Sequence, residues 1–82
     1  MKDTYFKDYE IEIASDVSER DGIGLNIYKN QEMIIEIFRD DTDKTFTISC
    51  YEIGLPLEFV ENAIELFKKE IPQEFINYDD FE

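Results

Sequence analysis

The stretch EIFRDDTDKTFTI, residues 36–48, sets three aspartates between two segments in which apolar and polar side chains alternate. A period of two is typical of a β-strand that is buried on one face. The aspartates suit a turn, because their short side chains bond to the local backbone. The stretch therefore predicts two consecutive antiparallel strands joined by an acidic turn, and it sets the pattern for the rest of the chain.

Both strands extend beyond this stretch. The first reaches back to residue 32 as EMIIEIFR, and the second continues to residue 51 as TFTISCY. The residues expected to face the core are Met33, Ile35 and Ile37 in the first strand and Phe46, Ile48 and Cys50 in the second. Those expected to face away in the first strand are Ile34, Glu36 and Phe38. Alternation of this kind favours a sheet with only one covered face.

Two further strands precede these. YEIEIA, residues 9–14, and IGLNIYK, residues 23–29, alternate in the same way. Turn-forming residues separate them, and a short connection at residues 30–31 leads into the next strand. Connections this short predict that neighbours along the chain are also neighbours in the sheet.

The period changes to that of a helix in PLEFVENAIELFKKEI, residues 56–71. Leu57, Val60, Ile64, Phe67 and Ile71 recur at spacings of three and four, which predicts a stripe that covers the sheet. Phe59, Ala63 and Leu66 broaden this stripe. The predicted fold is α+β: a four-stranded antiparallel meander with one long C-terminal helix packed on one face (ββββα). We expect a single domain over residues 1–82, with a flexible N-terminus at 1–8 and an acidic aromatic tail at 72–82.

Charge is the strongest compositional signal. The chain carries 21 acidic and 8 basic side chains, a formal net charge of −13. Direct binding to nucleic acid or to an anionic membrane surface is disfavoured, because both rely on lysine and arginine. The field attracts basic macromolecules instead, although acidity also serves solubility alone. The expected partner is therefore a basic protein.

The expected location is the cytoplasm. No apolar run approaches the roughly 18 residues that a membrane helix needs, and the first ten residues lack the apolar core of a signal peptide. The single cysteine, Cys50, has no partner for an internal disulfide, as is usual for proteins of a reducing compartment.

The predicted topology gathers carboxylates at one end of the sheet. In a meander the first and third connections emerge at the same end, and the helix returns the C-terminal tail toward it. The candidate partner-binding carboxylates are Asp16, Glu19 and Asp21 in the first connection, Asp40, Asp41 and Asp43 in the third, and Asp79, Asp80 and Glu82 in the tail. Arg20, Arg39 and Lys44 are expected to form surface ion pairs there, each worth at most ~1 kcal/mol.

Aromatic side chains are expected on the sheet face away from the helix. Tyr28, Phe38 and Tyr51 are candidate partner-binding residues there, because buried aromatics often dominate binding energy at interfaces. Two alternatives stay open: the tail or Tyr5 and Phe6 cover this face, or it mediates self-association.

Catalysis is not expected. The chain has no histidine to activate a serine or Cys50, and Cys50 is expected in the core. The stretch DVSERDG, residues 16–22, fails the calcium-loop pattern, since its glycine stands at the seventh position and not the sixth. One cysteine without histidine excludes a structural zinc site. We therefore expect no enzymatic activity, no metal and no cofactor.

In size and charge the chain resembles a functional class: protein inhibitors of nucleic-acid enzymes, such as immunity proteins against nuclease toxins, anti-CRISPR proteins and other nucleic-acid mimics. The resemblance implies a small acidic protein that occludes the basic surface of a nuclease toxin, a CRISPR effector or a similar protein. The alternative is a non-enzymatic scaffold or homodimeric module that binds through its aromatic sheet face or an edge strand.

Overall fold

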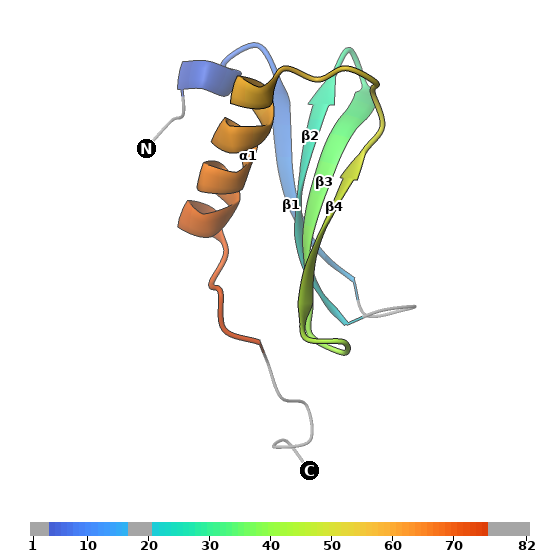
Figure 1. Cartoon of the computed structure of the whole chain (residues 1–82), viewed down its shortest axis with the longest axis vertical. Helices are drawn as coiled ribbons and strands as arrows, with labels where there is room; N and C mark the ends of the chain where they lie inside the picture. The colour runs from blue at the N-terminus through green and yellow to red at the C-terminus, as the bar shows by residue number, and fades with distance from the viewer. Residues whose placement is uncertain (1–3, 17–20, 76–82) are drawn as a thin grey trace.

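The computed structural model describes residues 4–16 and 21–75 and confirms the predicted fold class. Four antiparallel strands form one open sheet in the order β1-β2-β3-β4, and helix α1 lies along one face of it (Figure 1). The elements are the 3-10 turn η1 (Thr4–Phe6), β1 (Glu10–Asp16), β2 (Gly22–Lys29), β3 (Glu32–Asp40), β4 (Thr45–Cys50) and α1 (Leu57–Glu70). No helix in the two described stretches is long and apolar enough to span a membrane.

The core lies between α1 and the two central strands. Leu25 of β2 is paired with Ile37 of β3, and Ile27 is paired with Ile35. All four are buried and belong to one apolar cluster with the helix. The helix contributes Phe59, Ala63, Leu66 and Phe67 to its buried side. Full burial of one such aliphatic side chain contributes about 1.5–3 kcal/mol, so the central strands supply much of the stability.

The helix is rotated relative to the centre of the expected stripe, so that Phe59, Ala63 and Leu66, expected to broaden the stripe, are buried. Leu57, expected at the head of the stripe, is 73% exposed, whereas Phe59 is 3% exposed. Phe59 and Ala63 are four residues apart and both lie against the sheet. Val60 and Ile64, expected at the centre of the stripe, are half-buried at its border.

Aromatic packing before β1 explains this rotation. The Phe6 side chain is 2% exposed, and its ring stands edge-on to that of Phe59 with 5.3 Å between the ring centroids. Tyr5 and Tyr9 pack around the same pair. Residues 1–8 are expected to be a flexible N-terminus, but η1 within that segment is packed into the core. Aromatic residues without a regular period gave no sign of this contact in the sequence.

A β-bulge turns one strand residue toward the core. Ile27 is paired with Ile35, but its neighbour Tyr28 is paired with Met33, so Ile34 has no partner on β2. Two residues of β3 oppose one position of β2 there, which rotates the strand locally. Ile34 is 6% exposed and lies in the core cluster. The expectation that Ile34 faces away is therefore wrong.

The single helix leaves both edges of its sheet face partly uncovered. Ile11 and Ile13 of β1 are 39% and 44% exposed, and Phe46 and Ile48 of β4 are each 45% exposed. Cys50 is an exposed free thiol, so the expectation that it lies in the core is wrong. One α-helix has a diameter of about 10–12 Å with its side chains, while four strands at about 4.8 Å spacing make a wider sheet. The helix therefore covers only the part of each edge strand that lies next to the central strands.

Candidate functional site

The start of β2 and the β3–β4 turn meet at one end of the sheet, as the topology predicted (Figure 1). The backbone N–H of Asp41 donates to the carbonyl oxygen of Asp21 at 2.7 Å, which ties the β3–β4 turn to the start of β2. The Thr42 hydroxyl approaches an Asp21 carboxylate oxygen at 3.4 Å. We call the described aspartates at this end the acidic pole: Asp16, Asp21, Asp40, Asp41 and Asp43.

The outer half of the β3–β4 turn is held by Asp40. One of its carboxylate oxygens accepts hydrogen bonds from the backbone N–H groups of Thr42 and Asp43, at 3.0 and 3.1 Å. This side chain therefore closes the turn over its own backbone, a common use of aspartate. Asp43 and Lys44 are exposed beyond it, and Lys44 adopts a left-handed φ of 57°. The outer half presents its charges to solvent.

The inner half of the turn is a buried ion pair. Arg39 Nη2 donates to Asp41 at 3.1 Å, and Arg39 Nε lies 3.0 Å from the other Asp41 oxygen, outside good hydrogen-bond alignment. The two side chains are 6% and 0% exposed. Arg39 Nη1 also donates to the Pro72 carbonyl oxygen at 2.7 Å, so one guanidinium joins β3, the turn and the segment after α1.

This burial corrects two expectations from the sequence. Arg39 does not form a surface ion pair, and Asp41 is not an exposed contact residue. Arg39 has the same strand parity as Ile35 and Ile37, so the alternation already placed it on the face covered by the helix. The position of Arg39 in the alternation was thus the sequence signal for its burial. A buried arginine needs a carboxylate beside it, which predicts the inward position of Asp41.

The burial also changes the charge that the acidic pole presents. Arg39 is buried in an ion pair with Asp41 and does not offset the surface charge. Lys44 is the exposed cation of the described turn. At the end of α1, which runs back toward the pole, Glu70 and Glu74 are exposed (Figure 1). Four further candidates lie outside the described residues: Glu19, Asp79, Asp80 and Glu82.

Phe38 is not an exposed contact residue. Its side chain lies on the sheet face away from α1 but is 2% exposed. A Cβ added at Gly24 would come within 2.9 Å of the Phe38 ring, and one at Gly22 within 2.8 Å. The ring thus packs over the two glycines of the neighbouring strand, which lack the side chains that would displace it. Without the strand register, the sequence did not reveal this pairing.

Tyr28 and Tyr51 lie away from the acidic pole. Tyr28 stands near the end of β2 and Tyr51 directly after β4, and both strands run away from the pole. Tyr51 is 60% exposed, whereas Tyr28 is half-buried. Neither Phe75 nor Tyr5 and Phe6 covers this face: Phe75 packs on Phe46, and the other two pack near Phe59. The three predicted aromatic residues do not form one patch with the pole.

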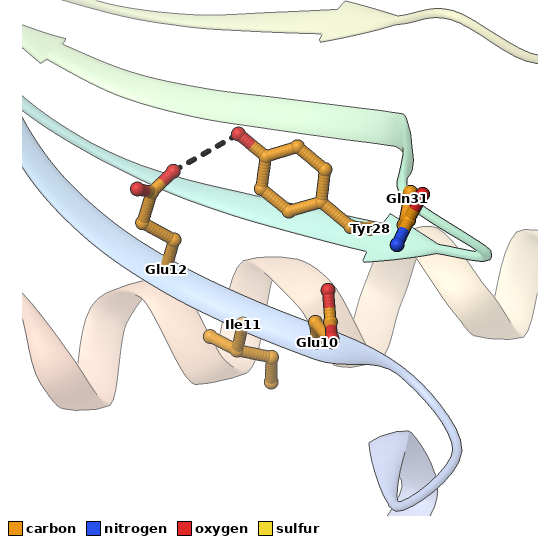
Figure 2. Close-up of a pocket in the computed structure, with 5 residues that line it drawn as sticks. All are labelled: Glu10, Ile11, Glu12, Tyr28 and Gln31. Carbon is orange, nitrogen blue, oxygen red and sulfur yellow. Dashed lines mark hydrogen bonds between the residues drawn. The ribbon is translucent and has the colours of Figure 1, made fainter.

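An open hollow of about 630 Å³ lies beside Tyr28, lined by Glu10, Ile11, Glu12, Tyr28 and Gln31 (Figure 2). The Tyr28 hydroxyl donates to Glu12 at 2.9 Å, and Asn26 donates to the same oxygen at 3.3 Å. The hydrogen bond to Glu12 raises the pKa of Tyr28, with burial and the Glu12 charge acting in the same direction. Sequence reasoning missed Glu12, which faces Asn26 across β1 and β2.

Between residues 4 and 16 and between 21 and 75, no group of three cysteine or carboxylate side chains is placed to hold a metal ion. Comparisons with protein-family models, with curated proteins and with solved structures give no match to this chain.

Proposed function

We propose that this protein is a small acidic inhibitor that occludes the basic surface of a nucleic-acid-processing protein, such as a nuclease toxin or a CRISPR effector. The observation that supports this role is the bond from the Asp41 N–H to the Asp21 carbonyl. It ties two acidic segments together at one end of a small rigid body. The role is non-catalytic and needs no cofactor.

The physical basis is competition with phosphate. A nucleic-acid enzyme presents a groove of lysines and arginines, and fixed carboxylates enter it in place of backbone phosphates. Long-range attraction by a net charge of −13 raises the rate of association. Carboxylates already held in place lose little conformational freedom on binding, which favours affinity.

The members of the acidic pole have different roles in this proposal. Asp43 is exposed and would contact the basic groove directly, with Asp21 and Asp40 beside it. Asp41 positions the turn and does not contact the partner, because its carboxylate is buried in an ion pair with Arg39. Charge reversal at Asp41 would therefore report on stability, and the test of binding belongs at Asp43.

The test uses purified basic nucleases of several classes: a ribonuclease toxin domain, a deoxyribonuclease toxin domain and a CRISPR effector. Inhibition is followed as loss of cleavage of a fluorescent nucleic acid, and association with the inhibited enzyme is timed by stopped flow at low and high salt. Asp43→Lys is compared with Glu61→Lys, an exposed carboxylate of α1 some nine residues before the end of the helix. Each variant replaces one negative side chain by a positive one, so the two variants have the same net charge.

We expect Asp43→Lys to slow association several-fold at low salt, and the difference from wild type to shrink at high salt. Steering by a whole charged surface is worth roughly 10- to 10³-fold in rate, so one reversed carboxylate accounts for part of it. Glu61→Lys should change the rate less. Equal effects of the two variants would remove the pole from the mechanism, and absence of inhibition across all three enzyme classes would overturn the proposed function.

A further inference from the structure

Within residues 4–16 and 21–75, no strand pairs with the outer edge of β4. β4 is the last strand in the sheet order of the described chain. The Tyr51 N–H donates to the Ile34 carbonyl of β3 at 2.9 Å. In an antiparallel ladder the bonded positions alternate, so the backbone groups of Phe46, Ile48 and Cys50 point away from β3, toward the open edge. These three residues offer N–H and C=O groups to an added strand.

This edge lacks the features that usually prevent strand addition. Natural edge strands carry charges, prolines or bulges that discourage pairing. β4, with the sequence TFTISC, has no charged residue and no proline, and its pairing with β3 shows no register shift. β1, the opposite edge, carries Glu10, Glu12 and Asp16. The two edges of one sheet are therefore protected very differently.

An apolar crevice of about 190 Å³ runs beside this edge, between β4 and α1. Phe46 and Ile48 form its strand side, and Ile64 and Phe67 form its helix side. The Phe46 and Phe67 rings meet edge-on, with 5.9 Å between their centroids. Side chains of an added strand on this face would bury the exposed halves of Phe46 and Ile48, so the edge offers apolar contact as well as backbone bonds.

We propose that the occupant is a second copy of this chain, paired β4 to β4 in antiparallel orientation about a two-fold axis at Ile48. In this register Ile48 lies opposite the partner's Ile48, and Phe46 lies opposite the partner's Cys50. An interface of this kind is self-complementary, because the same residues meet on both sides of the axis.

The charges flanking β4 match this arrangement. Lys44 precedes the strand and Glu52 follows it, and both are exposed. Antiparallel pairing brings Lys44 toward the partner's Glu52 at each end of the interface, whereas parallel pairing would bring like charges together. A basic strand from another protein would find no carboxylate along residues 45–50. The edge therefore suits its own copy better than it suits a cationic strand.

The same arrangement keeps the two acidic poles apart. Each pole lies at the start of its own β4, and antiparallel strands start at opposite ends. A six-residue strand spans about 20 Å at roughly 3.3 Å per residue. The Debye length at physiological salt is about 8 Å, so repulsion between the poles is largely screened. The dimer would present two poles in opposite directions.

Sedimentation velocity between 1 and 200 µM protein, about 0.15 M salt, tests the pairing. We expect the wild type to change from monomer to dimer across this range. Ile48→Lys places a charge at the centre of the interface and should remain monomeric. Ile13→Lys is the matched control, because Ile13 is equally half-exposed on the opposite edge strand. It should dimerise like wild type, and circular dichroism should show that both variants are folded.

A thiol introduced by Phe46→Cys tests the register. It would lie opposite the partner's Cys50 as a hydrogen-bonded pair, at about 5.5 Å between Cα atoms, which suits a disulfide. Oxidised glutathione accepts two electrons and two protons from the two thiols: its own S–S bond breaks to give two glutathione thiols as the interchain S–S bond forms. We expect a covalent dimer from this variant and none from the wild type, in which the two Cys50 thiols are offset by four residues.

Three results would each overturn the proposal. They are a wild type that stays monomeric at 200 µM, a monomeric Ile13→Lys beside a dimeric Ile48→Lys, and a folded Phe46→Cys that forms no covalent dimer.

Discussion

The inner and outer halves of the β3–β4 turn contain aspartates only two residues apart, yet these side chains have opposite environments. Asp41 is fully buried against Arg39, and Asp43 is exposed at the tip. The difference arises from a single cation: the guanidinium that projects from the covered face of β3 draws one carboxylate inward. A count of acidic residues therefore overstates the charge available for binding, and it hides the carboxylate on which the geometry of the acidic pole depends.

Removing the inner carboxylate should have the largest effect. Asp41→Asn leaves the buried Arg39 without a counter-charge, which costs about 3–5 kcal/mol where one partner of a buried pair is lost. Urea unfolding measures this change in the free energy of unfolding. Asp43→Asn is the matched control in the outer half and should stay within about 0.5 kcal/mol of wild type. Equal destabilisation by the two variants would abolish the distinction between the halves.

Replacing both members of the inner pair should restore much of that loss. Arg39→Met/Asp41→Leu removes both charges of the buried pair, and apolar replacements of buried pairs are often neutral or stabilising. We expect this double variant to unfold at a higher urea concentration than Asp41→Asn. Its Pro72 carbonyl loses a donor but belongs to an exposed residue and can bond to water. A double variant less stable than Asp41→Asn would show that the pair contributes more than mutual neutralisation.

The fold was predictable because its local signals agree. Alternation located all four strands, and the change of period located the helix. The short connection at residues 30–31 adopts positive φ at both Asn30 and Gln31. The misplaced residues depend on contacts between elements: Ile34 is turned inward by a bulge, and Leu57 is exposed because Phe59 packs on Phe6. No period within one segment carries that information.

The candidate site was predictable only in part. Topology alone predicted that the two acidic segments lie at one end of the sheet, and the structure places Asp21 of the first beside Asp41 of the second. Which side chains are exposed depends on the register. Phe38 is covered because it faces Gly24, and Asp41 is buried because Arg39 shares the parity of Ile37. The first fact follows from a cross-strand pair, which neither the composition nor the charge count contains. The second follows from the position of Arg39 in the alternation of β3, which the sequence already indicated.

Asp40 gives a smaller test, confined to the outer half. Asp40→Ala removes the acceptor of two backbone hydrogen bonds and should cost about 1 kcal/mol. Asp40→Asn keeps a side-chain oxygen in the same place and removes only the charge, so its stability should stay closer to wild type. In the association assay both variants lose one negative charge and should slow binding alike. Asp40→Asn as unstable as Asp40→Ala would mean that the charge, and not the turn geometry, stabilises this half.

Glu12 offers the smallest test, because its carboxylate is exposed like that of Asp43 but is held by Tyr28. The hydrogen bond to Glu12 raises the pKa of Tyr28, so the folded state favours the protonated phenol. That stabilisation is complete below the ordinary tyrosine pKa of about 10 and is lost as the pH rises through the raised value. Tyr28→Phe should therefore be slightly less stable than wild type at pH 8 and lose less stability between pH 9 and 11. Urea unfolding across this range measures both slopes.

Tyr5 is the internal control for this comparison. Burial and the Glu58 charge also raise the pKa of Tyr5, but Tyr5 is present in both proteins, so its contribution cancels in the difference. If the two slopes coincide, the Glu12 carboxylate is no more constrained than the one at the tip of the turn.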